Sequence, residues 1–540
     1  KARQYDRRFF SRDIQPHIFE ITESNTADRT SIEHFYGNDT ALKKDVEALL
    51  DTLKDAKEYG SILQMPAVDF GRINERFAQL GNEISMYNTY LLGDFQAMIR
   101  PTEIMSRKYA VVATNPPYLN KYDPLLKQFL NSQFSDYSGD MFSVFMVRNF
   151  GYCLNNGYSV FLTPNVWMSI KSYESLRNYI VDGKSIITLA QMAHGAFNEI
   201  ACVDVCAFVL ENGRNSQAGI YFKFSAFKGN MDVQKEKFLE ALNDSECSYR
   251  YETRIDDIKL VPTSPVTAFS ATENMLHLYG KSKLLSQVAD AKQGIATSNN
   301  NIFLRLWYEV SNHNLFLDCK THEESEASSA KWYPYNKGGN FRKWYGNNDY
   351  VVDWQHDGSR LKNFKGAVLR NQPYYFRECI SWSLISSYTI AFRYKPVGHL
   401  FDVAGMSCYG NGEVPIKYLL ALCNSCLIGD IMMMLAPTIN YQVGNISNIP
   451  VIYDRDKSMQ IIELVDENID LAKKDWDDYE TSWDFQINPL IREGNDCSLI
   501  KNAYAELQEV TNIKFNKLKE NEELLNELFL KGTSNNHLKL

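Results

Sequence analysis

An apolar run that stops at two prolines constrains this 540-residue chain more than any other stretch of its sequence. Residues 107–114, Arg-Lys-Tyr-Ala-Val-Val-Ala-Thr, lead directly into Asn115-Pro116-Pro117-Tyr118. The apolar and β-branched residues favour a strand, and the prolines end it because they fix φ and donate no backbone hydrogen bond. Ligands of open α/β sheets bind at the carboxyl ends of the strands. The sequence therefore predicts that Asn115 and Tyr118 lie at a reaction site.

The four residues of this corner suit methyl transfer to an exocyclic amine. The lone pair of such a nitrogen is delocalised into its ring, so the nitrogen is a poor nucleophile. We expect the side-chain oxygen of Asn115 and the carbonyl of Pro116 to accept its two N–H bonds and to stabilise the developing positive charge. Pro117 keeps the turn rigid, and Tyr118 stacks on a base that has left the duplex. A sulfonium methyl donor is already electrophilic, so no metal is predicted.

The tetrapeptide resembles the catalytic motif of the amino-group methyltransferases that act on adenine in DNA. The segments that follow resemble the later motifs of that family. Residues 140–145 open a helix, residues 157–165 predict the next strand and turn, and Phe197 precedes a strand at residues 203–210. The resemblance gives Phe197 the place of the aromatic ring that covers the flipped base. It implies S-adenosylmethionine as the methyl donor.

The cofactor site is less complete in this sequence. Residues 55–63 resemble the segment near the cofactor's adenine in large bacterial adenine methyltransferases, which makes Asp55, Gly60 and Asn115 candidates for cofactor binding. In the other interpretation, Asp55 and Glu58 are solvated helix charges and Gly60 is a helix stop. A Gly-rich turn and an acidic strand end, which normally hold a nucleotide cofactor, do not precede Asn115. We therefore expect the chain to start after the second strand and to bind S-adenosylmethionine poorly by itself.

A basic and aromatic region follows in an otherwise acidic chain. The net charge of −9 argues against a uniformly basic surface, so a DNA contact requires a local patch. Residues 331–400 contain 11 Lys or Arg against four acids, interleaved with many aromatic rings. This pattern suits phosphate contact and base-edge reading on double-stranded DNA, although an aromatic core under a solvated basic face would also explain it. The candidate DNA-binding residues are Lys337, Arg342, Lys343, Arg360, Arg370, Arg377, Arg393 and Lys395.

The same region carries a closer resemblance. Several segments resemble the target-recognition half of the PglX-type adenine methyltransferases of BREX phage-defence systems. They are residues 293–297, 303–307, 392–396, 401–405, 437–444 and 475–485. The resemblance covers nearly the whole chain. It implies methylation of a non-palindromic DNA site that marks host DNA, with other proteins of the defence complex as partners.

These observations predict the domain organisation. The expected fold class is α/β, with a partial Rossmann-like doubly wound methyltransferase sheet in residues 1–285. An α+β target-recognition domain in residues 286–455 and a helical region in residues 456–540 follow, the latter from its helix-like apolar spacing. Near the start of the chain, apolar positions at helical intervals predict a helix over residues 41–59.

The cysteine and hydropathy patterns indicate the cellular compartment in which the protein is expected. Ten cysteines without regular spacing are typical of reduced thiols in a cytoplasmic protein. Cys423 and Cys426 form a CxxC pair in an apolar stretch, where core packing is the ordinary interpretation and a zinc or redox site the alternative. The longest apolar run, residues 414–435, is interrupted by Lys417 and Asp430, so a buried helix is predicted there rather than a membrane span.

Three functions of different classes stay open at this point. The first is the DNA adenine methyltransferase described above. The second is a DNA-binding specificity fragment without catalytic activity, because the main cofactor motifs are missing. The third is a protein glutamine methyltransferase, since an Asn-Pro-Pro-Tyr turn also serves that chemistry, although it has no use for a large basic and aromatic domain.

Overall fold

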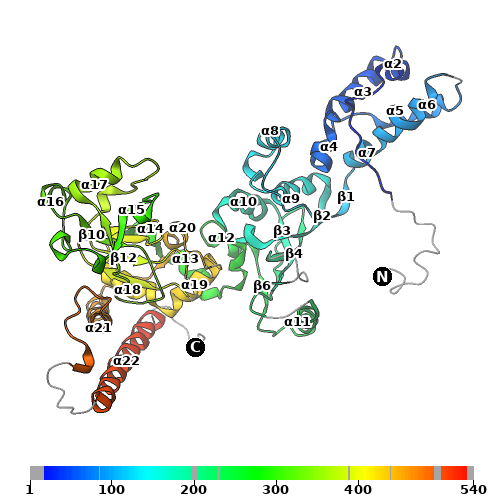
Figure 1. Ribbon diagram of the computed structural model, residues 1–540. Coiled ribbons are helices and arrows are strands. Elements are labelled where there is room, and N and C mark those ends of the chain that lie inside the picture. The colour runs from blue at the N-terminus through cyan, green and yellow to red at the C-terminus, as the bar shows by residue number, and fades with distance from the viewer. Residues whose placement is uncertain are drawn as a thin grey trace. The chain divides into compact units, whose positions relative to one another are not determined.

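The computed structural model of the chain is shown in Figure 1. It describes residues 17–83, 85–195, 203–227, 231–386, 389–437, 439–491 and 500–531. The chain divides into two compact units, one formed by Lys1–Trp167 with Ser172–Ile255, the other by Met168–Lys171 with Asp256–Leu540.

The first unit begins with helices that share one apolar core. They are α2 (Arg29–Tyr36), α3 (Thr40–Thr52), α4 (Ala56–Tyr59), α5 (Phe70–Leu80), α6 (Asn88–Tyr90) and α7 (Gln96–Ser106). Asp28, Asp39 and Asp69 precede α2, α3 and α5, and their carboxylates accept backbone N–H groups that would otherwise lack partners. The rings of Phe35 and Phe77 lie 4.6 Å apart in the core between these helices.

A six-stranded sheet completes this unit. Its order is β1-β2-β4-β3-β5-β6, with β1 and β2 parallel, β3 and β5 parallel, and β4 antiparallel to both β2 and β3. Three helices, α8 to α10, lie between β1 and β3 in the chain, as the α/β prediction requires. The elements are β1 (Tyr109–Thr114), α8 (Pro124–Gln133), α9 (Met141–Tyr152), β2 (Cys153–Pro164), α10 (Glu174–Gly183), β3 (Ser185–Gln191), β4 (Val205–Glu211), β5 (Gly219–Lys223), α11 (Met231–Asn243) and β6 (Arg250–Thr253).

The strand β1 lies at the edge of this sheet. It pairs with β2 along one side, and within the described residues no strand pairs with its other side. Val111 is 57% exposed, and Ala110 and Ala113 are exposed as well. Parallel sheets normally bury such apolar strands, so the free edge of β1 is unusual.

The second unit contains two four-stranded sheets, in the orders β14-β10-β11-β9 and β13-β12-β15-β8, and a two-stranded pair of β7 and β16. An aromatic core, the alternative interpretation of this region's rings, is present, with Trp344, Trp354 and Trp382 fully buried. The strands are β7 (Lys283–Leu284), β8 (Ala289–Lys292), β9 (Leu304–Leu306), β10 (Trp332–Asn336), β11 (Tyr350–Asp353), β12 (Cys379–Trp382), β13 (Phe392–Lys395), β14 (Leu400–Phe401), β15 (Ser407–Gly410) and β16 (Pro450–Val451).

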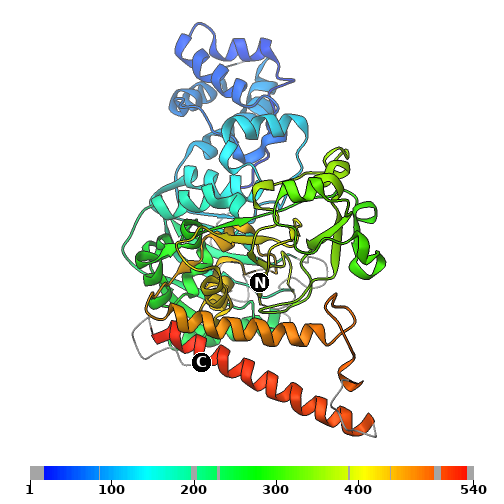
Figure 2. The same ribbon diagram turned by 90° about the vertical axis from the view of Figure 1, so that its left-hand side faces the viewer.

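Helices of the second unit surround these sheets and form its carboxyl-terminal part. In Figure 2 the orange α21 and the red α22 lie alongside each other. Within the described ranges no single helix is long and apolar enough to span a membrane, and α18 and α19, bent by 72° at their junction, meet that test only as a pair. The helices are α12 (Ile255–Leu260), which begins at the unit boundary, α13 (Glu273–Lys281), α14 (Leu285–Val288), α15 (Asn300–Phe303), α16 (His322–Ala327), α17 (Gln355–Lys362), α18 (Ile416–Asn424), α19 (Cys426–Leu435), α20 (Val443–Ser447), α21 (Ser458–Asp477) and α22 (Ile500–Lys531).

Candidate active site and nucleic-acid interface

The Asn-Pro-Pro-Tyr corner follows the carboxyl end of β1 directly. The ladder with β2 ends at Thr114, which pairs with Phe161, and the next residue is Asn115. Asn115 and Pro117 are exposed, whereas Pro116 is buried. The amide of Asn115 is therefore open to a ligand, while the residue beside it is packed into the unit.

The ring of Tyr118 is tied to the neighbouring strand. Its hydroxyl donates a hydrogen bond of 3.2 Å to the carbonyl oxygen of Leu162 in β2. Tyr118 remains 38% exposed, and partial burial raises the pKa of its hydroxyl. The hydroxyl thus stays protonated at neutral pH and fixes one end of an accessible aromatic ring.

Both residues that flank the corner are held by α9. The Nδ2 atom of Asn149 donates to Oγ1 of Thr114 at 2.9 Å. On the other side, Oδ1 of Asp140 accepts the backbone N–H of Leu119 at 3.1 Å and that of Phe142 at 3.2 Å. Burial raises the pKa of Asp140, although these backbone donors oppose the shift.

The same edge of the sheet carries polar groups that the sequence did not single out. His194 follows β3 and Asp204 precedes the antiparallel β4, so both lie at the edge where β1 ends. Their side chains, Nδ1 and Oδ1, are 2.8 Å apart. No sequence signal joins these two residues, which are ten positions apart. Phe197, predicted to cover the flipped base, lies outside the described residues, so its role stays a prediction.

The proposed cofactor residues Asp55 and Gly60 flank the short helix α4. Asp55 has a left-handed backbone (φ 55°) and exchanges two hydrogen bonds with the side chain of Asn25, of 2.6 and 2.8 Å. Gly60 ends α4 at φ 58°. A cavity of about 360 Å³ beside them is lined by Asp55 and by the rings of Tyr59 and Phe129, which stack at 4.3 Å. Gly60 is a helix stop, and Asp55 lines a cavity as well as carrying charge.

Four of the candidate DNA-binding cations are engaged with acids of the second unit. These contacts leave each side chain partly exposed, so the cations fix loops of the unit while their outer faces meet solvent. The pairs are Lys337 with Asp402 (2.7 Å), Arg342 with Asp475 (3.4 Å), Lys343 with Glu522 (2.8 Å) and Arg360 with Asp353 (2.9 Å).

Arg370 and Arg377 differ from those four residues. Both are exposed, and in the part of the chain that the structure describes neither forms an ion pair. The guanidinium of Arg377 lies over the ring of Tyr374, with 5.3 Å between its central carbon and the ring centroid. These two arginines retain the positive charge that a phosphate group would attract.

Arg393 and Lys395 correct the prediction of a DNA contact. They are 1% and 0% exposed, and Nζ of Lys395 donates to the carbonyl oxygens of Gly346 (2.9 Å) and Asn347 (3.1 Å). Burial lowers the pKa of Lys395 to about 7 and that of Arg393 to about 10. The prediction was wrong for these two because composition does not show that β13 directs them into the interior.

The CxxC pair lies within the helical part of the second unit. Cys423 is buried in α18, and Cys426 begins α19. Burial raises the pKa of the Cys423 thiol to about 12, so it stays protonated. Among the described residues, no group of three His, Cys, Asp or Glu side chains could hold a metal ion.

Comparison with known proteins identifies relatives of this chain. The family model described as Eco57I restriction-modification methylase matches residues 9–197. The chain is 30% identical to the adenine-specific methyltransferase PglX of Lacticaseibacillus casei (strain Zhang) over 98% of its own length and 45% of that protein's. It is 30% identical to the adenine-specific methyltransferase BrxX of Escherichia coli O9:H4 (strain HS) over 94% of its length and 43% of that protein's.

Among solved structures, the type IIL restriction-modification enzyme MmeI in complex with DNA is similar with a TM-score of 0.46 and 12% identity, over 86% of this chain and 63% of that chain. The chain spans less than half the length of the two curated relatives. The chain is thus related along nearly its whole length to parts of the adenine-specific methyltransferases PglX and BrxX, and residues 9–197 match the restriction-modification methylase model.

Proposed function

We propose that this chain carries the catalytic corner and the target-recognition unit of a DNA methyltransferase that acts on the exocyclic amino group of a flipped adenine. The observation that supports the proposal best is the corner itself. An exposed Asn115 follows the carboxyl end of β1. The buried Pro116 comes next, and the accessible Tyr118, whose hydroxyl is bonded to Leu162, completes the corner. This is the arrangement that the family's chemistry requires.

The proposed roles follow from hydrogen-bonding capacity. Oδ1 of Asn115 and the carbonyl oxygen of Pro116 accept the two N–H bonds of the adenine amino group, which draws the nitrogen towards tetrahedral geometry and stabilises its positive charge. Tyr118 stacks on the extruded base, and the bond from its hydroxyl to Leu162 keeps the ring in place. S-adenosylmethionine supplies the electrophilic methyl group when bound.

The described residues do not form a complete site for S-adenosylmethionine. The cavity beside Asp55 offers the carboxylates of Asp51 and Asp55 and three aromatic rings, but within the described residues the strand next to the corner, β1, pairs along one side only. We propose that further strands, which the rest of such an enzyme supplies, pair with β1 and carry most of the cofactor site. Activity is then expected from the larger protein and not from this chain alone.

The second unit is proposed to bind double-stranded DNA. Arg370 and Arg377 are the best candidates for phosphate contact because both are exposed and neither forms an ion pair among the described residues. Lys337, Arg342, Lys343 and Arg360 can add outer contacts. By family, we propose that methylation marks host DNA within a phage-defence complex.

Two other functions remain candidates. The free edge of β1 and the incomplete cofactor site support a DNA-binding specificity fragment without activity of its own. A protein glutamine methyltransferase ranks last, because the large second unit would have no purpose in it.

One experiment separates the three functions. The gene for the enzyme that contains this chain is expressed in a bacterial strain without adenine methylation, and extracts are supplied with tritiated S-adenosylmethionine. Label in DNA, recovered as N6-methyladenine, supports the proposal. Label in protein supports the glutamine methyltransferase, and DNA binding without any label supports the specificity fragment.

A further inference from the structure

One helix, α9, reaches both ends of the catalytic corner. Asn149, in its carboxyl-terminal half, donates from Nδ2 to Oγ1 of Thr114, the residue before Asn115. Asp140, which caps its first turn, accepts the backbone N–H of Leu119, the residue after Tyr118. The two residues that flank the tetrapeptide are therefore both fixed to a single rigid element.

The corner has little else in the backbone to hold it. Pro116 and Pro117 have no N–H to donate, and the ladder between β1 and β2 ends at Thr114. Leu119 compensates through its own backbone, because its carbonyl accepts the N–H of Met141 at 2.8 Å while its N–H reaches Asp140. Besides this backbone bond and the bond from Tyr118 to Leu162, the position of the tetrapeptide therefore depends on side chains that contact its flanks.

These side chains are buried. Asp140 is 8% exposed and Asn149 is 2% exposed. The carboxylate of Asp140 shares one oxygen between the corner, through Leu119, and the first turn of α9, through Phe142. Buried polar groups in such bonds are costly to leave unpaired, so the arrangement is well determined.

We infer that Asp140 and Asn149 are positioning residues for methyl transfer, which rests on the proposed function of the corner. They do not touch the base. They fix where the Asn115 amide oxygen and the Pro116 carbonyl oxygen lie relative to the ring of Tyr118. If Asp140 only capped α9, its loss would lower stability without a specific effect on the rate of the chemical step.

Enzyme kinetics test this inference in the methylation-competent enzyme that contains this chain. We compare Asp140→Ala, Asp140→Asn and the control Asp39→Ala, which removes a carboxylate that caps α3 through two backbone N–H groups. Because a shift of about 1 Å in a reacting group can cost roughly 100-fold in rate, Asp140→Ala is expected to lower kcat by about 10- to 100-fold, with KM for bacterial genomic DNA within about twofold. Asp140→Asn keeps an acceptor oxygen and is expected to restore kcat to within about threefold of wild type.

A double-mutant cycle tests the other end of α9. Thr114→Val and Asn149→Leu each remove one partner of the same hydrogen bond, so the double variant is expected to lower kcat no further than the worse single variant. Equal losses of kcat in Asp140→Ala and Asp39→Ala, failure of Asp140→Asn to restore kcat, or simple additivity in the cycle would overturn the inference.

A second readout keeps this inference separate from the proposed function. If the wild-type enzyme labels no DNA, the proposed function fails. Hydrogen exchange in this chain still tests whether Asp140 and Asn149 hold the two ends of the corner. Asp140→Ala is then expected to speed exchange of the Leu119 amide by about tenfold, because one protecting bond is lost, whereas Asp39→Ala leaves it unchanged. Unchanged exchange of that amide in Asp140→Ala would show that Asp140 does not hold this end of the corner.

Discussion

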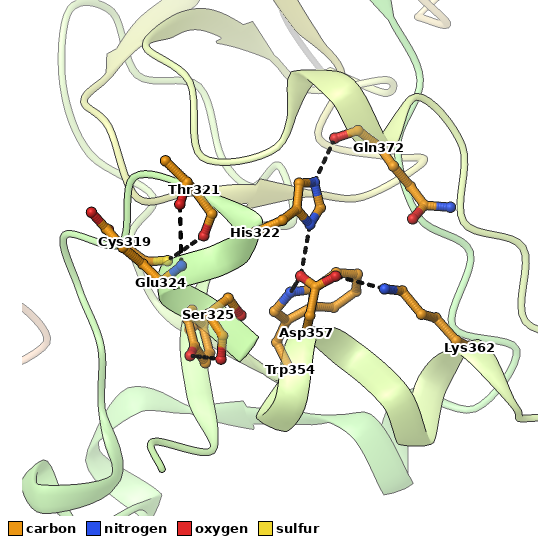
Figure 3. A network of polar contacts seen from close by, with 10 residues as sticks. Cys319, Thr321, His322, Glu324, Ser325, Trp354, Asp357, Lys362 and Gln372 are labelled. Atoms are coloured by element: carbon orange, nitrogen blue, oxygen red, sulfur yellow. Dashed lines mark hydrogen bonds and ion pairs between the residues drawn. The ribbon is translucent and has the colours of Figure 1, made fainter. Parts of the chain in front are cut away.

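Nδ1 of His322 lies 2.7 Å from Oδ1 of Asp357, and its Nε2 lies 3.1 Å from the carbonyl oxygen of Gln372 (Figure 3). Both partners are acceptors, so a ring nitrogen that carries hydrogen can donate to the partner it faces. The carboxylate of Asp357 also accepts from Nε1 of Trp354 at 3.0 Å and from Nζ of Lys362 at 2.6 Å. This network joins α16, α17 and the loop that carries Arg370 and Arg377.

Removing the imidazole is expected to destabilise the second unit. His322→Leu removes one hydrogen bond from the Asp357 carboxylate and one from the Gln372 carbonyl. Asp357 itself has a left-handed backbone (φ 49°) that the network helps to hold. We expect a loss of about 2 kcal/mol in the free energy of unfolding, measured by urea denaturation with tryptophan fluorescence. His313→Leu, on an exposed histidine, is the control. Equal changes in the two variants would contradict the prediction.

The amide of Asn115 is expected to be essential for methyl transfer but not for DNA binding. Asn115→Ala removes one of two proposed acceptors for the adenine amino group, so the single-turnover rate should fall by about 100- to 1000-fold. Affinity for DNA, measured by fluorescence anisotropy, should change less than about twofold, because phosphate contacts dominate it. Asn120→Ala, which changes an exposed asparagine in the following loop, is expected to retain the wild-type rate. An active Asn115→Ala variant would reject the assigned role.

Arg370 and Arg377 are expected to contribute to the salt dependence of DNA binding. Each phosphate contact releases condensed counterions, so Arg370→Ala and Arg377→Ala should each reduce the slope of log affinity against log salt by about 1. Lys44→Ala, on the exposed face of α3, should leave the slope unchanged. Arg393→Met provides the opposite case, since loss of this buried cation should change the denaturation midpoint rather than the slope. Unchanged slopes in both Arg370→Ala and Arg377→Ala would show that DNA binds to another surface of the protein.

His399 is expected to make the second unit sensitive to acid. Burial, together with the nearby Lys395, lowers the pKa of His399 to about 3 from its ordinary 6.5. The unfolded chain therefore takes up a proton first as the pH falls below 6.5, and folded stability decreases across the window from 6.5 towards 3, by at most about 1.4 kcal/mol per pH unit.

The measurement is urea denaturation at pH 7.5 and pH 4.8 in the wild type and in His399→Gln. The wild type should lose about 2 kcal/mol more than the variant over this interval, because pH 4.8 lies about 1.7 units below 6.5 and each unit costs at most about 1.4 kcal/mol. His313→Gln, on an exposed ring, should behave as the wild type does. The same acid loss in His399→Gln would assign the effect to other groups.

Local sequence signals predicted the strand and the corner well. Residues 109–114 form β1 because an apolar run and two prolines act within one segment of chain. The helix predicted over residues 41–59 was only partly correct, because α3 ends at Thr52 and Asp55 adopts a left-handed backbone before α4 begins. At that break the backbone of Asp55 is bonded to the side chain of Asn25, thirty residues away in the chain. The spacing of apolar residues in a helix cannot predict such a distant contact.

Long-range partners account for what the sequence did not predict. Arg393 and Lys395 have the same charge as Arg370 and Arg377, and only the packing of β13 separates a buried cation from an exposed one. Asn149 contacts Thr114 across 35 positions, so its link to the corner has no signature in the motif itself.

The uncovered side of β1 has a practical consequence for anyone who purifies this polypeptide. Within the described residues β1 pairs along one side only, so its outer backbone groups, beside exposed alanines and Val111, are a template on which a neighbouring molecule can add its own extended segment. Preparations of this chain should therefore form oligomers as their concentration rises.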